Sequence, residues 1–397
     1  MRVAVLTSSW PLGPRDWRGH FVREWCLAVQ DQGIAVQVLV PRAPEEPEAD
    51  DRLAVDYLPR ILPSRQGGFH GHGLEEELRR HPGLALGLPG TLAAFALEAL
   101  PRCLGLHALV AHWVWPMGLV GAWLSRMTGL PLGIVAHSGP PAVARVPGLS
   151  SLWRGTIGSA RSVACVSDAV ASILGGAMPP GGRVTIPLGV AVGPMANPST
   201  SPRLRVLFVG RMVSLKGGDL LIRALGGMPG VTLTMIGDGP ESSRWRGLAH
   251  DLQVEARFLG ETSPREVLGE MAGADLLVVP SRRGPGGRVE GMPRVILEAW
   301  SRGLPVVATD AGGGGEAVRR WGGGVAVGPG DVGALREVLE RLANAPADRD
   351  RLREQARQAA WEHRWEVLGP RWARWVRSLA QEASGEFRGG EGGGRFW

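Results

Sequence analysis

The chain has 397 residues, of which 44% are hydrophobic and 21% are charged. This length and composition are typical of a globular protein with two or three domains and a large apolar core. The net charge of +6 is spread along the chain and is not gathered in a stripe or tail, which argues against a nucleic-acid partner and leaves a weak attraction to anionic lipid open.

Short apolar runs, typical of buried strands, alternate with helical patterns along the first half of the chain. The first run, which starts at Met1, is too short for a signal peptide and predicts a strand. Helices are expected at about 18–32 and 116–127. The strands are expected at about 2–7, 35–40, 53–58, 108–111, 132–136, 162–166 and 183–187.

The run from Leu84 to Leu100 is the longest apolar stretch of this half, and it is interrupted by Gly87, Pro89, Gly90 and Glu98. It falls short of the ~20 clean apolar residues that a membrane-spanning helix needs. We therefore expect a core helix, and a helix that dips into a membrane remains the alternative.

Residues 191–203 are rich in proline, serine and glycine, a composition typical of a linker. We place a first domain at 1–192, the linker at 193–203 and a second domain at 204–363. In the second domain, helices are expected at about 216–226, 290–302 and 331–343, and strands at about 204–209, 231–236, 255–259, 275–279, 305–308 and 324–327.

This alternation predicts an α/β fold of two doubly wound parallel sheets, which are Rossmann-like domains with ligand bound at the carboxyl ends of the strands in a central cleft. A C-terminal helix is expected at 364–384 and a disordered, glycine-rich tail at 385–397. Four tryptophans near this end, at 361, 365, 372 and 375, have helical spacing. They predict a core-facing stripe, with an interfacial membrane helix as the alternative.

The three cysteines, Cys26, Cys103 and Cys165, are odd in number and far apart. Their spacing matches no disulfide framework and no metal-binding motif. We therefore expect buried thiols and a cytoplasmic protein.

A single lysine, Lys216, remains in a chain whose other basic residues are arginine. It lies between Gly210 and Gly218, after an apolar run and at the start of a helical pattern. Because Lys is a compact, flexible charge and Arg a planar fork, retention of this one lysine suggests a phosphate site, although a biased chain could also keep one lysine by chance.

Two carboxylates, Glu290 and Glu298, lie eight residues apart around a predicted helix start. Glu290 belongs to the loop that faces the cleft, and Glu298 lies in an apolar helix where an unpaired carboxylate is costly and ligand hydroxyls would serve as donors. Between them, Gly291, Met292 and the residues up to Arg294 offer backbone N–H groups to an anion, and Pro293 suits the first helical turn.

This arrangement resembles the E-x7-E motif of retaining GT-B glycosyltransferases, glycosyltransferase family 4. Arg211 and Lys216 match the basic pair of the family, and Gly237 lies in a G-D-G-P turn similar to the one that follows a family strand. The segments 274–281 and 309–316, the latter with Glu316, occupy the expected places before and after the acidic motif. The segment 111–118, which includes His112, resembles members that build cell-surface polysaccharides.

The resemblance implies a role for each matched residue. Arg211 and Lys216 would neutralise the diphosphate of a UDP- or GDP-sugar, Glu290 would hold hydroxyls of the transferred sugar, and Glu298 would accept from the ribose. Two further matches lie in the first domain. His137 matches the histidine near sugar and acceptor, and Gly19 matches the loop that approaches the phosphate, with a structural turn glycine as the equal alternative for Gly19.

The resemblance also implies a GT-B fold whose C-terminal helices cross back to the first domain. The acceptor would be a glycan or a lipid-linked glycan, and the reaction would retain anomeric configuration. No Asp-x-Asp follows a strand, so we expect a metal-independent enzyme without a cofactor beyond its donor substrate. Association with the cytoplasmic face of a membrane stays open.

Two segments depart from the family pattern. Ser138, Gly139 and Pro140 follow His137 where the family often has Gly-x-Asp, and Leu188 stands where an asparagine is usual. A non-catalytic nucleotide-sugar-binding paralogue therefore remains an alternative. A nicotinamide-dependent oxidoreductase is disfavoured, since no G-x-G-x-x-G follows the first strand.

Overall fold

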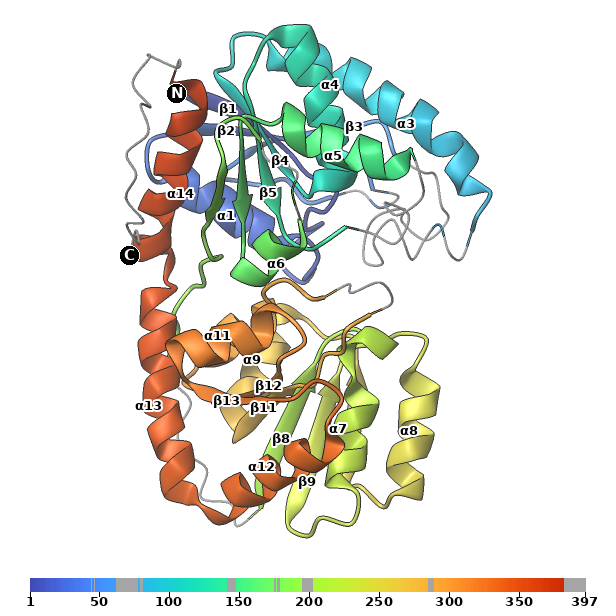
Figure 1. Ribbon diagram of the computed structural model, residues 1–397, viewed down its shortest axis with the longest axis vertical. Coiled ribbons are helices and arrows are strands. Elements are labelled where there is room, and N and C mark those ends of the chain that lie inside the picture. Colours follow the sequence, from blue (N-terminus) through green and yellow to red (C-terminus); the bar gives the residue numbers. More distant parts are fainter. Residues whose placement is uncertain are drawn as a thin grey trace.

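The computed structural model consists of two α/β domains stacked along the long axis of the molecule (Figure 1). It describes residues 1–43, 45, 47–61, 78, 81–140, 148–174, 176, 179–194, 203–284 and 289–381. The predicted linker and the predicted C-terminal tail lie largely or wholly outside the described residues.

The first domain is built on a seven-stranded parallel sheet of order β3-β2-β1-β4-β5-β6-β7. Its central strands are continuous apolar runs because helices cover both faces. In the register, Val3 pairs with both Val36 and Ala108. The strands are β1 (Arg2–Leu6), β2 (Ala35–Pro41), β3 (Ala54–Leu58), β4 (Ala108–His112), β5 (Leu132–Ala136), β6 (Ser162–Cys165) and β7 (Arg183–Thr185). The helices are α1 (His20–Gln30), α3 (Leu84–Ala99), α4 (Leu119–Thr128), α5 (Leu149–Ser159) and α6 (Asp168–Ile173).

The second domain has a six-stranded parallel sheet of order β10-β9-β8-β11-β12-β13. The strands are β8 (Leu204–Val209), β9 (Val231–Ile236), β10 (Ala256–Gly260), β11 (Leu276–Val279), β12 (Val306–Thr309) and β13 (Gly324–Val327). The helices are α7 (Gly218–Leu225), α8 (Ser242–Asp251), α9 (Pro264–Gly273), α10 (Arg294–Trp300), α11 (Gly313–Trp321) and α12 (Val332–Asn344). The two doubly wound sheets confirm the fold class expected from the sequence, and every predicted strand is present to within about two residues at each end.

Two C-terminal helices, α13 (Pro346–Glu362) and α14 (Trp365–Ala380), run along one side of the molecule and return to the first domain (Figure 1). Trp372 and Trp375 are buried there, and their indole N–H groups donate to the carbonyl of Pro187 at 3.0 Å and to the hydroxyl of Ser162 at 3.1 Å. These contacts confirm the core-facing interpretation for this pair. Trp361 differs, because it belongs to α13, which ends before α14 begins, and 57% of it is exposed.

The expectation of a core helix at 84–100 is wrong. Helix α3 forms, but it lies on the surface of the first domain, and its buried residues are Phe95, Ala96 and Ala99. By length and composition alone, the 20 residues from Leu84 to Cys103 would suffice to cross a membrane. Only 17% of the most apolar 18-residue stretch within them is buried in the protein. The three cysteines are buried, as predicted.

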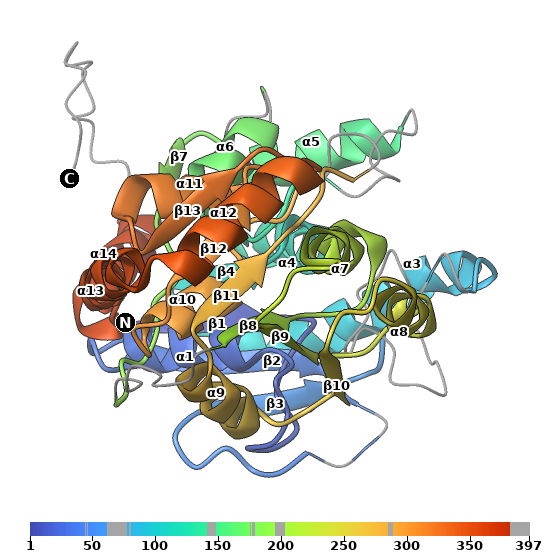
Figure 2. The ribbon, with the colours of Figure 1, turned by 90° about the horizontal axis from the view of Figure 1, so that it is seen from below.

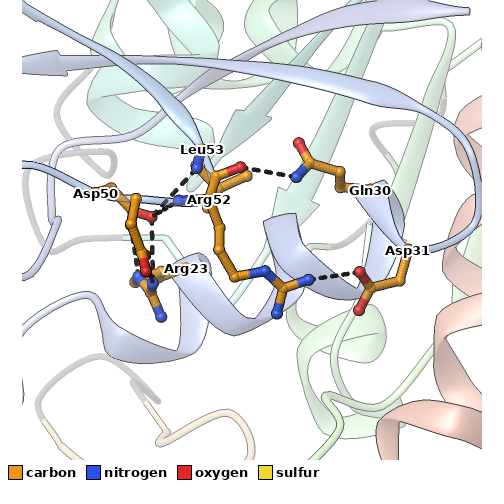
Figure 3. A network of polar contacts seen from close by, with 7 residues as sticks. Arg23, Gln30, Asp31, Asp50, Arg52 and Leu53 are labelled. Carbon is orange, nitrogen blue, oxygen red and sulfur yellow. Dashed lines mark hydrogen bonds and ion pairs between the residues drawn. The ribbon is translucent and has the colours of Figure 1, made fainter.

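Helix α1 is fixed by a polar network at its outer side (Figure 3). Asp50 accepts two hydrogen bonds from Arg23, at 2.5 and 3.2 Å, and also accepts from the backbone N–H groups of Arg52 and Leu53. Gln30 donates to the carbonyl of Arg52 at 2.8 Å. The loop before β3 thereby anchors a helix whose first turn faces the second domain.

Candidate active site

The candidate site lies where the order of the second sheet reverses, between β8 and β11. Such a switch point is where parallel sheets bind ligands, because the loops from the two strands part there. The loop after β8 carries Lys216, and the loop after β11 carries Ser281. The two loops come into contact at Gly217. Its φ is 66°, and a Cβ on it would lie 2.0 Å from the carbonyl oxygen of Pro280.

Three of the predicted catalytic residues converge at this point. The ammonium of Lys216 contacts Glu290 Oε1, and the Ser281 hydroxyl donates to Glu290 Oε2 at 2.8 Å. Burial raises the pKa of Glu290, but the charges of Lys216 and Arg211 and the hydrogen bonds outweigh it, so that the pKa is below its ordinary value. About a fifth of each side chain of the Lys216–Glu290 pair stays exposed, so the pair is open to a ligand.

The Lys216 loop is held by two residues that the sequence analysis did not single out. Arg282 donates to both carboxylate oxygens of buried Asp219, at 2.7 and 2.8 Å, and its backbone N–H donates to the carbonyl of Leu215 at 2.7 Å. A carboxylate in the first turn of an apolar helix was the available signal for Asp219. Arg282 had none, since it is one arginine among many.

Gly237 supports the neighbouring Arg211 segment. Its φ is 121°, and a Cβ on it would lie 2.1 Å from the carbonyl oxygen of Gly210, so the G-D-G-P turn packs directly on that backbone. The N–H of Met212 donates to the carbonyl of Asp238 at 2.7 Å. The position of Gly237 beside the basic pair therefore has a steric reason in the fold.

Gly291 brings the Glu290 loop against the first domain. A Cβ at this position would lie 2.1 Å from the carbonyl oxygen of His137. On the other side, a Cβ on Gly313 would lie 1.8 Å from the carbonyl oxygen of Gly291, and the N–H of Gly313 donates to the carbonyl of Glu290 at 3.1 Å. Glycine at both positions lets the loop sit between the two domains.

The start of the following helix differs from the prediction. Helix α10 begins at Arg294, so Pro293 is the residue before the helix and does not lie in its first turn. Met292 is buried beside it. Among the described residues, no acceptor is found for the N–H groups of Gly291 and Met292, so the expectation that they bind an anion stays a prediction.

Across the interface, half-buried His137 lies in an aromatic cluster at the ends of β4 and β5, next to fully buried His112. Its Nε2 lies 2.9 Å from Nδ1 of His112, so one ring donates to the other. Burial, followed by the charge of Arg294, lowers the pKa of His137 to about 3, and His112 is lowered well below its ordinary value as well. Both rings are therefore neutral at pH 7, and the N–H of one ring lies between the two facing nitrogens. Trp113, with φ 69°, holds a left-handed conformation that is strained for a tryptophan.

Glu298 lies in a second charged cluster that spans the domains. Arg294 donates to Glu24 of α1 at 2.8 Å and lies 3.6 Å from Glu298. Burial pushes the pKa of Glu24 upward, but Arg294 and a hydrogen bond from His20 outweigh it and lower that pKa to about 2. The pKa of Glu298 is raised, by burial and by the charge of Glu24. Glu298 therefore has a partner in Arg294, in addition to the ligand hydroxyls expected from the sequence.

Gly19 precedes α1 with φ 66°, and a Cβ on it would lie 2.4 Å from the carbonyl oxygen of Ser9. Glycine is therefore required by the turn itself, whichever ligand approaches it. The described residues contain no group of three or more His, Cys, Asp or Glu side chains suited to a metal ion.

Known proteins match both the site-bearing domain and the whole fold. Residues 196–359 match the family model described as Glycosyl transferases group 1. A GDP-mannose-dependent monoacylated alpha-(1-6)-phosphatidylinositol monomannoside mannosyltransferase of Corynebacterium glutamicum is 36% identical over 169 residues, which are 41% of this chain and 44% of that protein. A GDP-mannose-dependent alpha-(1-6)-phosphatidylinositol monomannoside mannosyltransferase of Mycolicibacterium smegmatis is 29% identical over 67% of this chain and 75% of its own length. The matched region thus spans less than half of the first relative.

Two solved structures share the architecture. Sucrose-phosphate synthase from Thermosynechococcus elongatus superposes with a TM-score of 0.76 over 96% of this chain and 99% of its own, at 21% identity. Anabaena HepE in complex with UDP-glucose gives a TM-score of 0.69 over 95% and 100%, at 20% identity. Residues 196–359 are therefore similar to the glycosyl transferases group 1 family, and the two-domain chain has the GT-B fold.

Proposed function

We propose that the chain is a retaining, metal-independent glycosyltransferase of family 4 that moves a sugar from a UDP- or GDP-sugar to a glycan or lipid-linked acceptor in cell-surface polysaccharide or glycolipid synthesis. The observation that carries this proposal is the convergence of Lys216, Arg211 and Glu290 at the switch point of the second sheet, opposite His137. GDP-mannose is the first donor to test, because two relatives are named as GDP-mannose-dependent.

The paired charges suggest how the donor enters. Without a donor, Lys216 and Glu290 neutralise each other. A diphosphate would replace Glu290 as the partner of Lys216, and the sugar hydroxyls would donate to Glu290 in place of the ammonium. Negative charge grows on the diphosphate as the glycosidic bond breaks, so Lys216 and Arg211 would stabilise the transition state more than the bound substrate. This is the support for metal independence.

The site also limits what His137 can do. Its Nε2 faces His112, and its pKa is about 3, so at pH 7 it is a neutral hydrogen-bonding group. We assign it to positioning of sugar or acceptor and not to charge stabilisation. The buried thiols suit the reducing cytoplasm, where we place the reaction.

Substitution of Lys216 tests the proposal. Lys216→Ala should reduce transfer by about 10³-fold, the order expected for one lost charged contact in a transition state. Arg223→Ala, an exposed basic residue on the neighbouring helix α7, is the matched control and should leave transfer unchanged. Near-normal turnover by Lys216→Ala would refute the assignment. Product NMR reports the anomeric configuration, and activity in EDTA reports metal dependence.

A non-catalytic nucleotide-sugar-binding protein is the second candidate, because the acidic residue usual after the family histidine is missing at Ser138–Pro140. Calorimetric binding of a donor, with neither transfer nor donor hydrolysis over long incubation, would favour this candidate. A thermal-shift screen of UDP- and GDP-sugars identifies the donor in both cases, since a bound ligand stabilises the folded state.

A further inference from the structure

Exposed large apolar side chains of the first domain are concentrated on helices α3, α4 and α5 and on the segment that follows α3. Seven of the ten large apolar side chains that are exposed among the described residues lie between 84 and 152. Leu86 on α3 is 90% exposed, Leu97 is 60% exposed, and Met127 on α4 is 59% exposed. We call these residues, together with Leu104, Trp123 and Leu152, the apolar face. Figures 1 and 2 show α3 at the outer edge of the domain, on the side away from α13 and α14.

The exposure of this face is not a by-product of packing. Helix α3 is held to the domain by buried Phe95, Ala96 and Ala99 and by the partly buried leucines Leu84, Leu88 and Leu92, which pack against the core. An ordinary surface helix carries polar residues on its outer side, because that side meets water. Along α3 the outer side is alanine, leucine, glycine and one proline, and Glu98 is its one charged residue. A side chain such as Leu86 gains nothing from the fold and is stabilised only by a partner outside it.

Charge identifies that partner. Only one of the chain's 38 acidic residues, Glu98, falls within residues 81–167, whereas five arginines do. Glu98 itself lies 3.5 Å from Arg102. Arg126 on α4 and Arg154 on α5 are exposed beside the apolar face. An apolar helix bordered by arginine and almost free of acid suits a bilayer surface that contains anionic lipid.

We propose that the chain binds anionic membranes by laying the apolar face into the lipid interface, with α3 parallel to the membrane plane. A spanning orientation would strip Phe95, Ala96 and Ala99 from the domain, so α3 stays docked and inserts only its outer side. This inference goes beyond the proposed function and does not depend on it, because it concerns lipid binding and not sugar transfer.

Vesicle flotation tests the proposal with the full chain. The wild type should float with phosphatidylcholine vesicles that contain 30% phosphatidylglycerol, and about tenfold less with pure phosphatidylcholine. The double variant Leu86→Gln/Leu97→Gln should lose at least tenfold of this binding. Val184→Gln/Trp361→Gln removes two exposed apolar side chains elsewhere and should bind as the wild type does. Equal binding by all three proteins, or no binding to anionic vesicles, would overturn the proposal.

A fluorescent probe locates the inserted surface. The native cysteines are at most 1% exposed, so a cysteine introduced by Leu97→Cys or Trp361→Cys can be labelled selectively with an environment-sensitive dye. Anionic vesicles should shift the emission at 97 to the blue and leave 361 unchanged. A response at 361 alone would place the membrane on α13. A blue-shifted signal at 97 before lipid is added would mean that protein, from this chain or a second copy, already covers the face. Either result would refute the inference, whether or not the protein transfers sugar.

Discussion

The contact between Gly291 and His137 predicts that a single methyl group will hold the domains apart. In Gly291→Ala, the new Cβ would lie 2.1 Å from the carbonyl oxygen of His137 and 3.2 Å from Cγ2 of Val170. Backbone supplies the nearest atom, so no side chain can rotate away. To restore an ordinary contact of at least 3.4 Å, the loop and the first domain must separate by roughly 1 Å or more.

A displacement of about 1 Å in a catalytic arrangement costs on the order of 10²-fold in rate. We therefore expect Gly291→Ala to lower kcat/KM for sugar transfer by about 100-fold. The stability of the second domain should change little, because Gly291 lies in a loop at the interface and contributes no side chain to the core. Donor affinity should fall less than turnover, since Lys216 and Arg211 remain in place.

The assay compares steady-state transfer, calorimetric donor binding and thermal unfolding in the variant and in a matched control. Gly247→Ala serves as that control: it adds the same methyl group inside α8, where no atom lies within 4 Å. It should stabilise the helix by roughly 0.5–1 kcal/mol and leave transfer unchanged. Wild-type kcat/KM in Gly291→Ala would refute the reasoning, because the contact could not then belong to the reactive state.

Three further predictions follow from the same geometry. His112→Phe removes the ring nitrogen that orients His137 and should lower kcat about tenfold with donor KM unchanged. His112→Asn keeps a polar group near the Nδ1 position and should recover part of the lost kcat. If His112 were merely structural, the substitutions would change the melting temperature without this selective loss of kcat. Arg282→Ala leaves buried Asp219 without its bidentate partner and should cost about 2 kcal/mol in urea unfolding and raise donor KM. Burial lowers the pKa of His363 to about 4, so the unfolded chain binds a proton at this residue before the folded chain does, and folding stability is lost as pH falls from about 6.5 to 4. His363→Leu should remove up to about 3 kcal/mol of this loss. An unchanged dependence of the unfolding free energy on pH would contradict the prediction.

The sheets were predictable because burial on both faces forces strands such as Leu132–Ala136 to be apolar throughout. The two misjudged helical segments have different causes. Helix α3 is apolar enough for a core, and nothing local in its sequence records that its neighbours leave its outer side uncovered. The four-residue spacing from Trp361 to Trp365 implies a shared face only within one helix, and the break at His363 and Arg364 removes that premise.

For the site, the sequence supplied the residues whose chemistry is unusual in their context. Lys216 is the one lysine, and Glu290 and Glu298 are carboxylates around an apolar helix. Contacts between residues that only the fold brings together could not be predicted from the sequence. The Glu24–Arg294 bond joins residues 270 positions apart, and the His112–His137 pair depends on two strands lying side by side. Such pairings follow from sheet order, which a single sequence does not encode locally.

The geometry gives a physical reason for the surviving lysine. The side chain of Lys216 crosses the loop so closely that its Cδ and Cε would lie 3.6 Å from a Cβ on Gly210, and its Nζ then reaches Glu290. A guanidinium is wider than an ammonium and spreads its donors in a fixed plane, so it is less suited to follow this path and to present a compact charge to Glu290 and to the donor phosphate that we propose. At an exposed position the exchange of Lys for Arg meets no such limit. A bias toward arginine would therefore replace lysine across the surface and stop at this site, where the narrow space beside Gly210 and the contact with Glu290 both favour the smaller cation.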